Sequence, residues 1–195
     1  MGENRKKMKV LVACEESQEV CKAFRKLGHE AYSCDIIDCS GGHPEWHIKD
    51  DVLKHLNEGW DLMIAHPPCT YLCRNRARLN KKQRITPDKS FFMKLLNADI
   101  PKICVENPVP SKAAALPRYT QLIQPWQFGH DASKKTCLWL KNLPKLKPTK
   151  IVEYTYITTP NGKRYTRWWY KCPRNSIARS KTFPGIAKAM AEQWG

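Results

Sequence analysis

The sequence predicts an α/β fold: a doubly wound, mostly parallel sheet with a small basic β-hairpin appended to it. Strand-like apolar runs alternate with helix-like segments over the first 110 residues, which is typical of parallel sheets. Further along, two alternating runs flank Pro160-Asn161-Gly162, a turn sequence typical of a hairpin. No repeat, linker or low-complexity tract divides the chain, so we expect one domain over residues 1–195.

The elements predicted before residue 110 follow one another in the order expected for a parallel sheet. Strands are predicted over 9–13, 30–35, 60–65 and 100–105, helices over 17–27, 51–56 and 86–97, a loop over 38–50 and a basic polar run over 74–84. The strands are short apolar runs, whereas the first helix has apolar residues at helical spacing. Ser17 is its predicted N-cap, unless Glu15 or Glu16 shifts the start, and Gly28 ends it.

Local breakers define the remaining boundaries. Gly41, Gly42 and Pro44 interrupt any regular pattern in the loop, and Thr86-Pro87 begins the helix over 86–97 as N-cap and first turn. Glu106-Asn107-Pro108 ends the strand over 100–105. Beyond residue 110 we expect strands over 136–140, 151–158 and 164–170 and a closing helix over 185–194.

The composition indicates a polyanionic partner. Lys and Arg number 34 against 18 Asp and Glu, so the formal net charge is +16. Such an excess is typical of proteins that bind nucleic acid, although a basic protein that is merely very soluble remains an alternative. The apolar runs are too short to cross a bilayer, so no membrane partner is expected.

The nine cysteines argue against a disulfide scaffold, because their number is odd and no signal peptide opens the chain. A reducing cytoplasm is therefore the predicted location. The local group of Cys34, Cys39, His43 and His47 matches no closed tetrahedral spacing, so we expect no metal.

The most informative stretch ends in Pro67-Pro68-Cys69. Two prolines cannot continue a sheet ladder, so the strand over 60–65 must end there and present Cys69 at the carboxyl edge of the sheet. Open α/β sheets place their chemistry at that edge, which makes Cys69 a candidate nucleophile. A buried cysteine that acts as a small apolar residue is the alternative.

Acidic residues follow other strands of the predicted sheet. Asp35 ends the second strand, and Asp51 lies in the next connection. An acid after the second strand can accept the hydroxyl groups of a ribose, so the pair predicts an adenosine-containing cofactor. Both acids could instead cap helices or face solvent. Glu106, which follows the strand over 100–105, could protonate a ring that Cys69 attacks, or act only as a capping acid.

Two of these motifs carry a family resemblance. Pro67-Pro68-Cys69 and Val105-Glu106-Asn107 resemble the Pro-Cys and Glu-Asn-Val motifs of the DNA cytosine-5 methyltransferases. The chain as a whole looks like a small phage or prophage member of that group. The resemblance extends over 9–35, Asp51-Val52, the basic stretch Ser133-Lys134-Lys135-Thr136-Cys137 and the closing segment 179–194.

The resemblance implies a Rossmann-like methyltransferase sheet, S-adenosylmethionine as cofactor and DNA as partner. Cys69 would add to carbon 6 of cytosine, Glu106 would protonate ring nitrogen 3, and Lys135 would assist them. A lowered thiol pKa, which a basic surface helps to supply, would favour the attack. Because neither ring atom can be reached inside a duplex, the base must be flipped out or already single-stranded. The implied cofactor-binding residues are Cys14, Glu15, Asp35, Ile36, Asp51, Val52, His66 and Pro67.

The chain departs from the family pattern at three places. The first motif of the family is rich in glycine, whereas this chain has Ala13-Cys14-Glu15-Glu16-Ser17. His66 stands where a glycine usually precedes the Pro-Pro-Cys step. The Gln-x-Arg-x-Arg signature is reduced to Lys134 and Lys135.

Residues 141–179 form a short basic and aromatic insert where the family often has a full target-recognition domain, so weak or short sequence specificity is expected. Its cations and aromatic residues are Lys163, Arg164, Tyr165, Arg167, Trp168, Trp169, Tyr170, Lys171 and Arg174. This mixture is typical of phosphate contact combined with base stacking, although such side chains also pack on a sheet or face water. The predicted DNA-binding residues are Arg74, Arg76, Lys134, Arg164, Arg167 and Trp168.

Two other functions stay open at this point. The glycine-poor first motif would also fit a catalytically silent DNA-binding protein on a methyltransferase scaffold. The short insert would also fit methylation of a pyrimidine nucleotide or of RNA. The sequence leaves the target site and the oligomeric state open.

Overall fold

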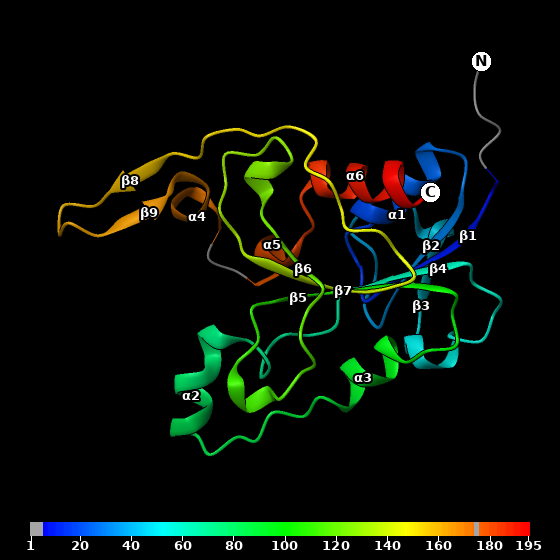
Figure 1. Cartoon of the computed structure of the whole chain (residues 1–195), viewed down its shortest axis with the longest axis horizontal. Coiled ribbons are helices and arrows are strands. Elements are labelled where there is room, and N and C mark those ends of the chain that lie inside the picture. The colour runs from blue at the N-terminus through cyan, green and yellow to red at the C-terminus, as the bar shows by residue number, and fades with distance from the viewer. Residues whose placement is uncertain (1–5, 174–175) are drawn as a thin grey trace.

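Seven strands form the central sheet in the computed structural model, which describes residues 6–173 and 176–195 (Figure 1). The strands are β1 (Lys9–Ala13), β2 (Glu30–Asp35), β3 (His47–Lys49), β4 (Leu62–Ala65), β5 (Lys102–Pro108), β6 (Gln121–Ile123) and β7 (Thr136–Lys141). Their order is β3-β2-β1-β4-β5-β7-β6. The first five strands pair in parallel, and β7 runs antiparallel to both of its neighbours. The predicted α/β class with a mostly parallel sheet is therefore confirmed.

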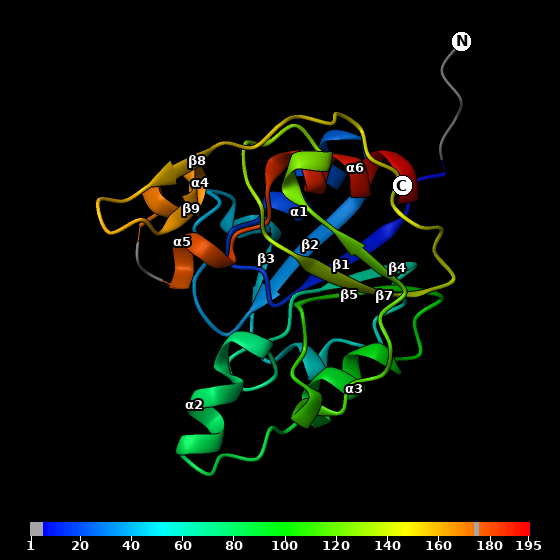
Figure 2. The same cartoon turned by 60° about the vertical axis from the view of Figure 1, so that its left-hand side comes forward.

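Helices cover both faces of this sheet. Helices α1 (Glu19–Lys26) and α6 (Pro184–Trp194) lie on one face, and α3 (Ser90–Leu96) lies on the other (Figures 1 and 2). The alternation along β1 explains how one strand serves two cores: Val10 and Val12 join the cluster under α1 and α6, whereas Leu11 and Ala13 join the cluster on the α3 side. A strand that is buried on both faces reads as a continuous apolar run, which is why β1 could be predicted.

The start of α1 differs from the prediction. Gln18 is the N-cap, with a left-handed φ of 58°, and it makes no side-chain capping bond. The carboxylate of Glu15 does the capping instead, because it accepts hydrogen bonds from the backbone N–H groups of Val20 (2.7 Å) and Cys21 (3.2 Å). Ser17 was therefore the wrong cap. The predicted stop is confirmed, since Gly28 follows the helix with a φ of +87°.

Two short elements lie where a loop was predicted over 38–50. A 3-10 turn spans Pro44–Trp46, and β3 follows it directly. Strand β3 has only three residues, and it pairs with β2 through the register Ser33↔His47. The Ser33 hydroxyl and the His47 ring nitrogen Nδ1 are 2.8 Å apart. Because β3 is short and polar, its pairing with β2 rather than its own pattern makes it a strand.

The segments on either side of β4 are more helical at one place and less helical at two others than predicted. A 3-10 turn over Arg74–Arg76 leads into α2 (Ala77–Lys82), within the run that was predicted as merely polar. The helix predicted over 51–56 is a 3-10 turn over Val52–Lys54. The helix predicted from Thr86 begins only at Ser90, because the Asp88 carboxylate accepts hydrogen bonds from Ser90 N (2.8 Å) and Oγ (2.9 Å) there.

Strand β5 is longer than predicted. It continues through Glu106, Asn107 and Pro108, which pair antiparallel with Leu138, Cys137 and Thr136 of β7. Its parallel neighbour β4 reaches only to the pair Ala65↔Val105. Glu106 thus lies just beyond the parallel part of the sheet, but within a strand. Strand β6 was not predicted at all.

The predicted hairpin is present, but its strands are shorter than expected. Strands β8 (Tyr156–Thr158) and β9 (Arg164–Thr166) pair antiparallel. The chain then turns into α4 (Arg167–Lys171), where a strand was expected to run to residue 170, because the hydroxyl of Thr166 caps the helix by accepting from Trp169 N. Helix α5 (Ser176–Ser180) follows, and the hairpin with α4 and α5 lies at one end of the molecule (Figure 2). The closing helix α6 is confirmed.

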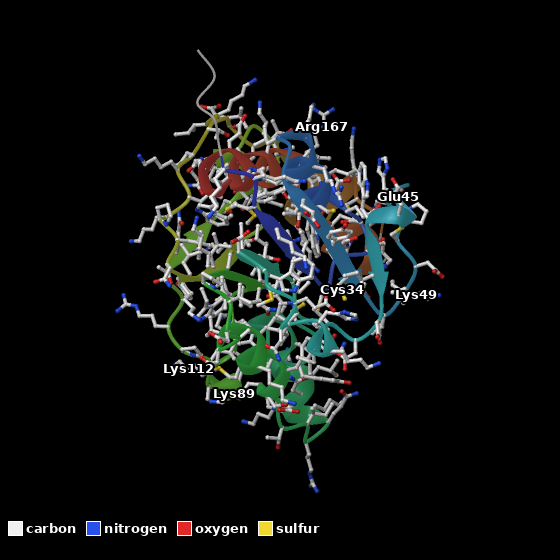
Figure 3. All side chains as sticks on the ribbon, turned by 90° about the vertical axis from the view of Figure 1, so that its right-hand side faces the viewer. Cys34, Glu45, Lys49, Lys89, Lys112 and Arg167 are labelled. Atoms are coloured by element: carbon white, nitrogen blue, oxygen red, sulfur yellow. The ribbon has the colours of Figure 1, made fainter. Side chains whose placement is uncertain are left out.

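Basic side chains reach solvent from several parts of the molecule. Figure 3 labels Lys49 on β3, Lys89 before α3, Lys112 after β5 and Arg167 on α4, all of which are exposed. Arg167 lies at the opposite end of this view from Lys89 and Lys112. Within the described residues, no helix is long and apolar enough to cross a membrane.

Candidate active site

A cleft of about 460 Å³ opens at the carboxyl ends of β1, β2, β4 and β5. It is lined by Cys14, Glu15, Glu16, Ser17, Asp35, Ile37, His66, Pro67, Pro68, Cys69, Thr70, Glu106, Pro108, Lys134, Arg179, Ser180, Lys181 and Thr182. These residues come from segments that are far apart in the sequence, and the strand order brings them to one edge of the sheet. The cleft contains most of the predicted catalytic and cofactor-binding residues.

Two hydrogen bonds, one from the backbone and one from a side chain, hold the loop that carries Cys69. His66 N donates a 2.9 Å hydrogen bond to the carbonyl of Ala13 at the end of β1. The Asn107 side chain, which is 1% exposed, donates through Nδ2 to the carbonyl of Pro67 at 2.9 Å. Asn107 therefore ties the loop to β5, and Cys69 follows as a half-buried residue that lines the cleft.

The pKa of the Cys69 thiol differs from the expectation. Burial, together with the neighbouring Cys73 and Glu106, raises it to about 11. The basic surface does not lower it, so the expected low pKa is wrong for the protein without substrate. At neutral pH the group is a thiol, and it must lose its proton before it can attack.

Glu106 and His66 form a buried pair beside Cys69. Glu106 Oε2 and His66 Nδ1 are 3.0 Å apart, and the two side chains are 16% and 12% exposed. Burial alone would raise the pKa of Glu106, but the hydrogen bond and charge of His66, together with Lys134 and Thr136, hold that pKa below its ordinary value. Burial works to lower the pKa of His66, and Glu106 and Glu15 outweigh it and raise that pKa. The pairing therefore favours the ionised form of both groups.

Of the two adjacent lysines, Lys134 lines the cleft. Its Nζ donates to the carbonyl of Arg179 at 2.9 Å, and its charge acts on both Glu106 and His66. Lys135 is exposed and lies outside the lining of the cleft. Neighbouring residues of an extended chain point to opposite sides, so only one of the two can face the site. The assisting role expected for Lys135 fits the position of Lys134 better.

The turn after β1 keeps the backbone conformation that glycine usually supplies. Cys14 has a φ of 58°, which is uncommon for a residue with a side chain. Burial raises the pKa of the Cys14 thiol to about 12, and the nearby acids Asp35 and Asp51 contribute to the rise. Glu15 lines the cleft, but its carboxylate is occupied in capping α1. Besides Glu15, the residues of this turn that line the cleft are Cys14, Glu16 and Ser17.

Asp35 and the residues after it suit an adenosine group. The predicted Ile36, which is 73% exposed, lies outside the lining of the cleft, whereas Asp35 at the end of β2 and Ile37, 47% exposed, are part of it. Asp51 and Val52, in contrast, are not part of the lining. Asp51 accepts a 3.0 Å hydrogen bond from Leu53 N as a cap, which is the alternative left open by the sequence, and Val52 is buried.

The predicted DNA-binding residues fall in two regions. Arg74 and Arg76 lie on the 3-10 turn after the Cys69 loop, and Arg76 lies 5.9 Å from the ring centre of Tyr71. Arg164 and Arg167 are exposed on the hairpin and α4. Trp168 instead packs on Phe183, with the ring centres 5.1 Å apart. Arg174 lies outside the described residues.

A second hollow, of about 670 Å³, lies beside the hairpin. It is lined by Thr159, Pro160, Asn161, Lys163, Tyr165, Trp169, Tyr170 and Arg179. Arg179 lines both this hollow and the cleft, and its guanidinium carbon lies 4.0 Å from the ring centre of Trp169. Arg179 and Lys181 lie in the closing segment 179–194 that the resemblance covers, and Trp169 belongs to the basic and aromatic insert, but none of the three is among the predicted site residues. The basic run before Phe183-Pro184-Gly185 was the available signal for the first two.

The metal prediction can be compared only with the described part of the chain. There, no group of three or more His, Cys, Asp or Glu side chains is placed to hold a metal ion. No protein-family model matches this sequence, and no curated protein matches it. The site geometry and the motifs are therefore the basis for a functional proposal.

Proposed function

We propose that this chain is a DNA cytosine-5 methyltransferase that uses S-adenosylmethionine and acts through a covalent adduct on Cys69. The observation that carries the proposal is one cleft that contains Cys69, Glu106 and Asp35 together. A thiol and a carboxyl group beside one cavity suit addition to a pyrimidine ring, and an acid with exposed apolar neighbours suits an adenosine group. The resemblance of the Pro-Pro-Cys and Val-Glu-Asn motifs points to the same chemistry.

The strand order supports a Rossmann-like sheet. The order β3-β2-β1-β4-β5 is that of dinucleotide-binding folds, in which ligands bind where the strand order reverses. In this sheet the reversal lies between β1 and β4. Cys14 and His66 directly follow those two strands, and both line the cleft.

The residues present fit S-adenosylmethionine at the β1–β2 side of the cleft. Asp35 accepts a long hydrogen bond, 3.4 Å, from Ile37 N, which leaves its carboxylate able to accept the two ribose hydroxyls. Ile36 and Ile37 would flank the adenine, and the left-handed turn at Cys14 would bring the backbone near the cofactor. When bound, the cofactor supplies the methyl group that carbon 5 of cytosine takes up.

The chain's own residues would carry the ring chemistry. After its proton passes to water, the Cys69 sulfur forms a bond to carbon 6, and the electron pair of the ring double bond moves toward nitrogen 3. Glu106, protonated for this step, gives its proton to nitrogen 3, so carbon 5 becomes nucleophilic. Later the proton on carbon 5 passes to water, the double bond forms again, and Cys69 leaves as a thiolate. Nitrogen 3 then returns its proton to Glu106.

The hollow beside the hairpin would meet the nucleic acid around the flipped base. It combines cations with exposed aromatic rings, and Trp169 and Tyr170 are 41% and 53% exposed. Aromatic rings of this kind stack on bases while cations contact phosphates. Arg179 would connect the two sites, because it lines both.

Trapping with DNA that contains 5-fluorocytosine tests the proposal. A fluorine on carbon 5 cannot leave as a proton does, so the adduct persists after methyl transfer. We expect a covalent protein–DNA complex for the wild type in the presence of S-adenosylmethionine, and none for Cys69→Ala. Cys39→Ala is the matched control: this half-buried thiol lies in the loop after β2, and its loss should leave the adduct unchanged.

The other outcomes separate the competing functions. DNA binding without an adduct, and without affinity for S-adenosylmethionine, would favour the silent DNA-binding scaffold, to which the raised pKa of Cys69 lends support. An adduct on RNA or methylation of a free nucleotide, with none on DNA, would favour the other substrates. An adduct that survives Cys69→Ala would contradict the proposed nucleophile.

A further inference from the structure

His66 and Glu106 form a buried pair at the carboxyl edge of the sheet, where β4 lies between β1 and β5. His66 follows β4 and Glu106 lies on β5, so the strand order places them side by side, and their side chains meet at 3.0 Å. Both side chains are more than four-fifths buried. Within the described residues, the other ring nitrogen of His66, Nε2, is buried and has no hydrogen-bond partner. The imidazole is thus held by one contact, which is to the acid of the proposed reaction.

The charged and titratable groups around the pair come from every neighbouring element. Glu15 faces His66 from the turn after β1, and Lys134 faces both members from the segment before β7. The Thr136 hydroxyl on β7 also helps to lower the pKa of Glu106. The thiols of Cys69, Cys104 and Cys137 also lie close enough to be affected by the charge of Glu106.

The proposed reaction needs a proton at this place. Nitrogen 3 of cytosine must be protonated when the Cys69 sulfur adds to carbon 6, and a carboxylate has no proton to give. His66 holds the pKa of Glu106 below its ordinary value, which favours the carboxylate, and the raised pKa of His66 favours keeping the proton on the imidazole. The 3.0 Å hydrogen bond between the two groups is the path along which that proton can move between them.

We propose that His66 is a positioning residue that stores the proton which Glu106 delivers to the cytosine ring. As the bond between Cys69 and carbon 6 forms, the proton on His66 Nδ1 passes to Glu106 Oε2, and Glu106 passes a proton to nitrogen 3. When Cys69 leaves, nitrogen 3 returns the proton to Glu106 and then to His66, so the pair is restored without net change. This inference rests on the proposed function.

A buried pair of this kind needs a reason to exist, because desolvation of the two charges offsets most of their attraction. A glutamine in place of His66 could donate a neutral hydrogen bond to Glu106 and keep it in position. What glutamine cannot do is carry an extra proton near neutral pH. The variant His66→Gln therefore separates storage of the proton from placement of the carboxylate.

The decisive measurement is the pH dependence of methyl transfer in a single turnover. In the wild type we expect a bell-shaped profile, whose fall at high pH reports loss of the proton from the pair. In His66→Gln that fall should move to lower pH by about one unit or more, which corresponds to a roughly tenfold lower rate at the pH where the wild type begins to fall. The rate at lower pH should recover to within a few-fold of the wild type.

The matched control is His47→Gln, a half-buried histidine on β3 that contacts Ser33 and the carbonyl of Ile37. It should leave the high-pH limb unchanged. If His66→Gln lowered the rate equally at every pH, and the fall at high pH stayed where it is in the wild type, the role of His66 would be purely structural and the proposal would be overturned.

An NMR titration of the His66 ring in the ligand-free protein gives a second readout that needs no activity. We expect His66 to titrate above its ordinary value of 6.5 in the wild type and at clearly lower pH in Glu106→Gln. An identical titration in the two proteins would overturn the shared proton. If the wild type methylates no DNA, the proposed function fails, whereas an active His66→Gln with an unchanged limb defeats only this inference.

Discussion

Cys69, the proposed nucleophile, has to ionise in an environment that opposes its ionisation. Cys69 has to be a thiolate to react, yet its place at the end of β4 buries it beside Glu106 and another thiol, Cys73, and its pKa rises to about 11. The proposed chemistry requires Cys69 and Glu106 to lie beside the same cleft. The negative charge of Glu106 nevertheless raises the pKa of the thiol and so opposes its ionisation. The free protein is therefore expected to be slow toward electrophiles, and substrate binding must favour the thiolate.

Alkylation of Cys69 by iodoacetamide tests this electrostatic picture. Because the pKa is raised, the thiolate fraction at neutral pH is small, and the rate should climb roughly tenfold per pH unit and still be rising at pH 9.5. Mass spectrometry of the Cys69 peptide gives the rate separately from the other thiols. In unfolded protein the same peptide should level off above its ordinary value of 9.0. A plateau below pH 8 in the folded protein would contradict the raised pKa.

At the scale of elements, the start of α6 depends on a close backbone contact. Pro184 occupies the first turn, where its missing N–H is not needed. Gly185 N donates a 2.8 Å hydrogen bond to His130 Nε2, and a Cβ at this position would lie 2.1 Å from the carbonyl oxygen of Phe128. Helix α6 in turn packs against α1, so this contact locates the helical layer over the sheet and the segment from Arg179 to Thr182 at the cleft.

Gly185→Ala should therefore destabilise the fold. The neighbour is backbone and cannot move aside cheaply, so we expect a loss of about 1–3 kcal/mol in the free energy of unfolding, the usual cost of overpacking. Urea denaturation gives the value. The control Lys188→Ala removes an exposed pair with Glu192 on the same helix and should change stability by less than about 0.5 kcal/mol. Equal effects of the two substitutions would contradict the close contact.

At the scale of the whole molecule, the charge of +16 is distributed over many elements, and only part of it lies near the proposed site. Arg164 and Arg167 are carried by the hairpin and α4, beside the hollow that shares Arg179 with the cleft. Lys89 and Lys112 lie far from Arg167 in the view of Figure 3, near its lower edge, whereas Arg167 lies near its upper edge. If DNA binds along the cleft and the hairpin, these two groups of cations should contribute differently.

The salt dependence of DNA binding distinguishes them. The double variant Arg164→Ala and Arg167→Ala should weaken binding and reduce the slope of log K against log salt by about 1–2, because each lost phosphate contact releases one counterion fewer. The pair Lys89→Ala and Lys112→Ala should leave the slope unchanged. Fluorescence anisotropy with a labelled duplex measures both. Equal slopes in the two double variants would place the DNA elsewhere.

The sequence alone determined the parts of this protein that follow from local rules. Buried strands such as β1 and β4, the stop of α1 at Gly28, the Pro160-Asn161-Gly162 turn and helix α6 were predictable because apolar periodicity and turn residues act over a few neighbouring positions. The positions of Cys69 and Asp35 at strand ends followed in the same way. A strand that ends at a proline pair places the next residue at the sheet edge in any such fold.

Only the tertiary structure decided how those residues combine. Strands β3 and β6 have three residues each and exist through their neighbours, so no pattern of their own marks them. The cap of α1 by Glu15 and the choice of Lys134 over Lys135 depend on which side of the chain faces the cleft. His66 and Glu106 are 40 residues apart in sequence and meet only because β4 and β5 are adjacent strands. The hydrogen bond and charges at that meeting point outweigh burial and so decide the direction in which both pKa values shift.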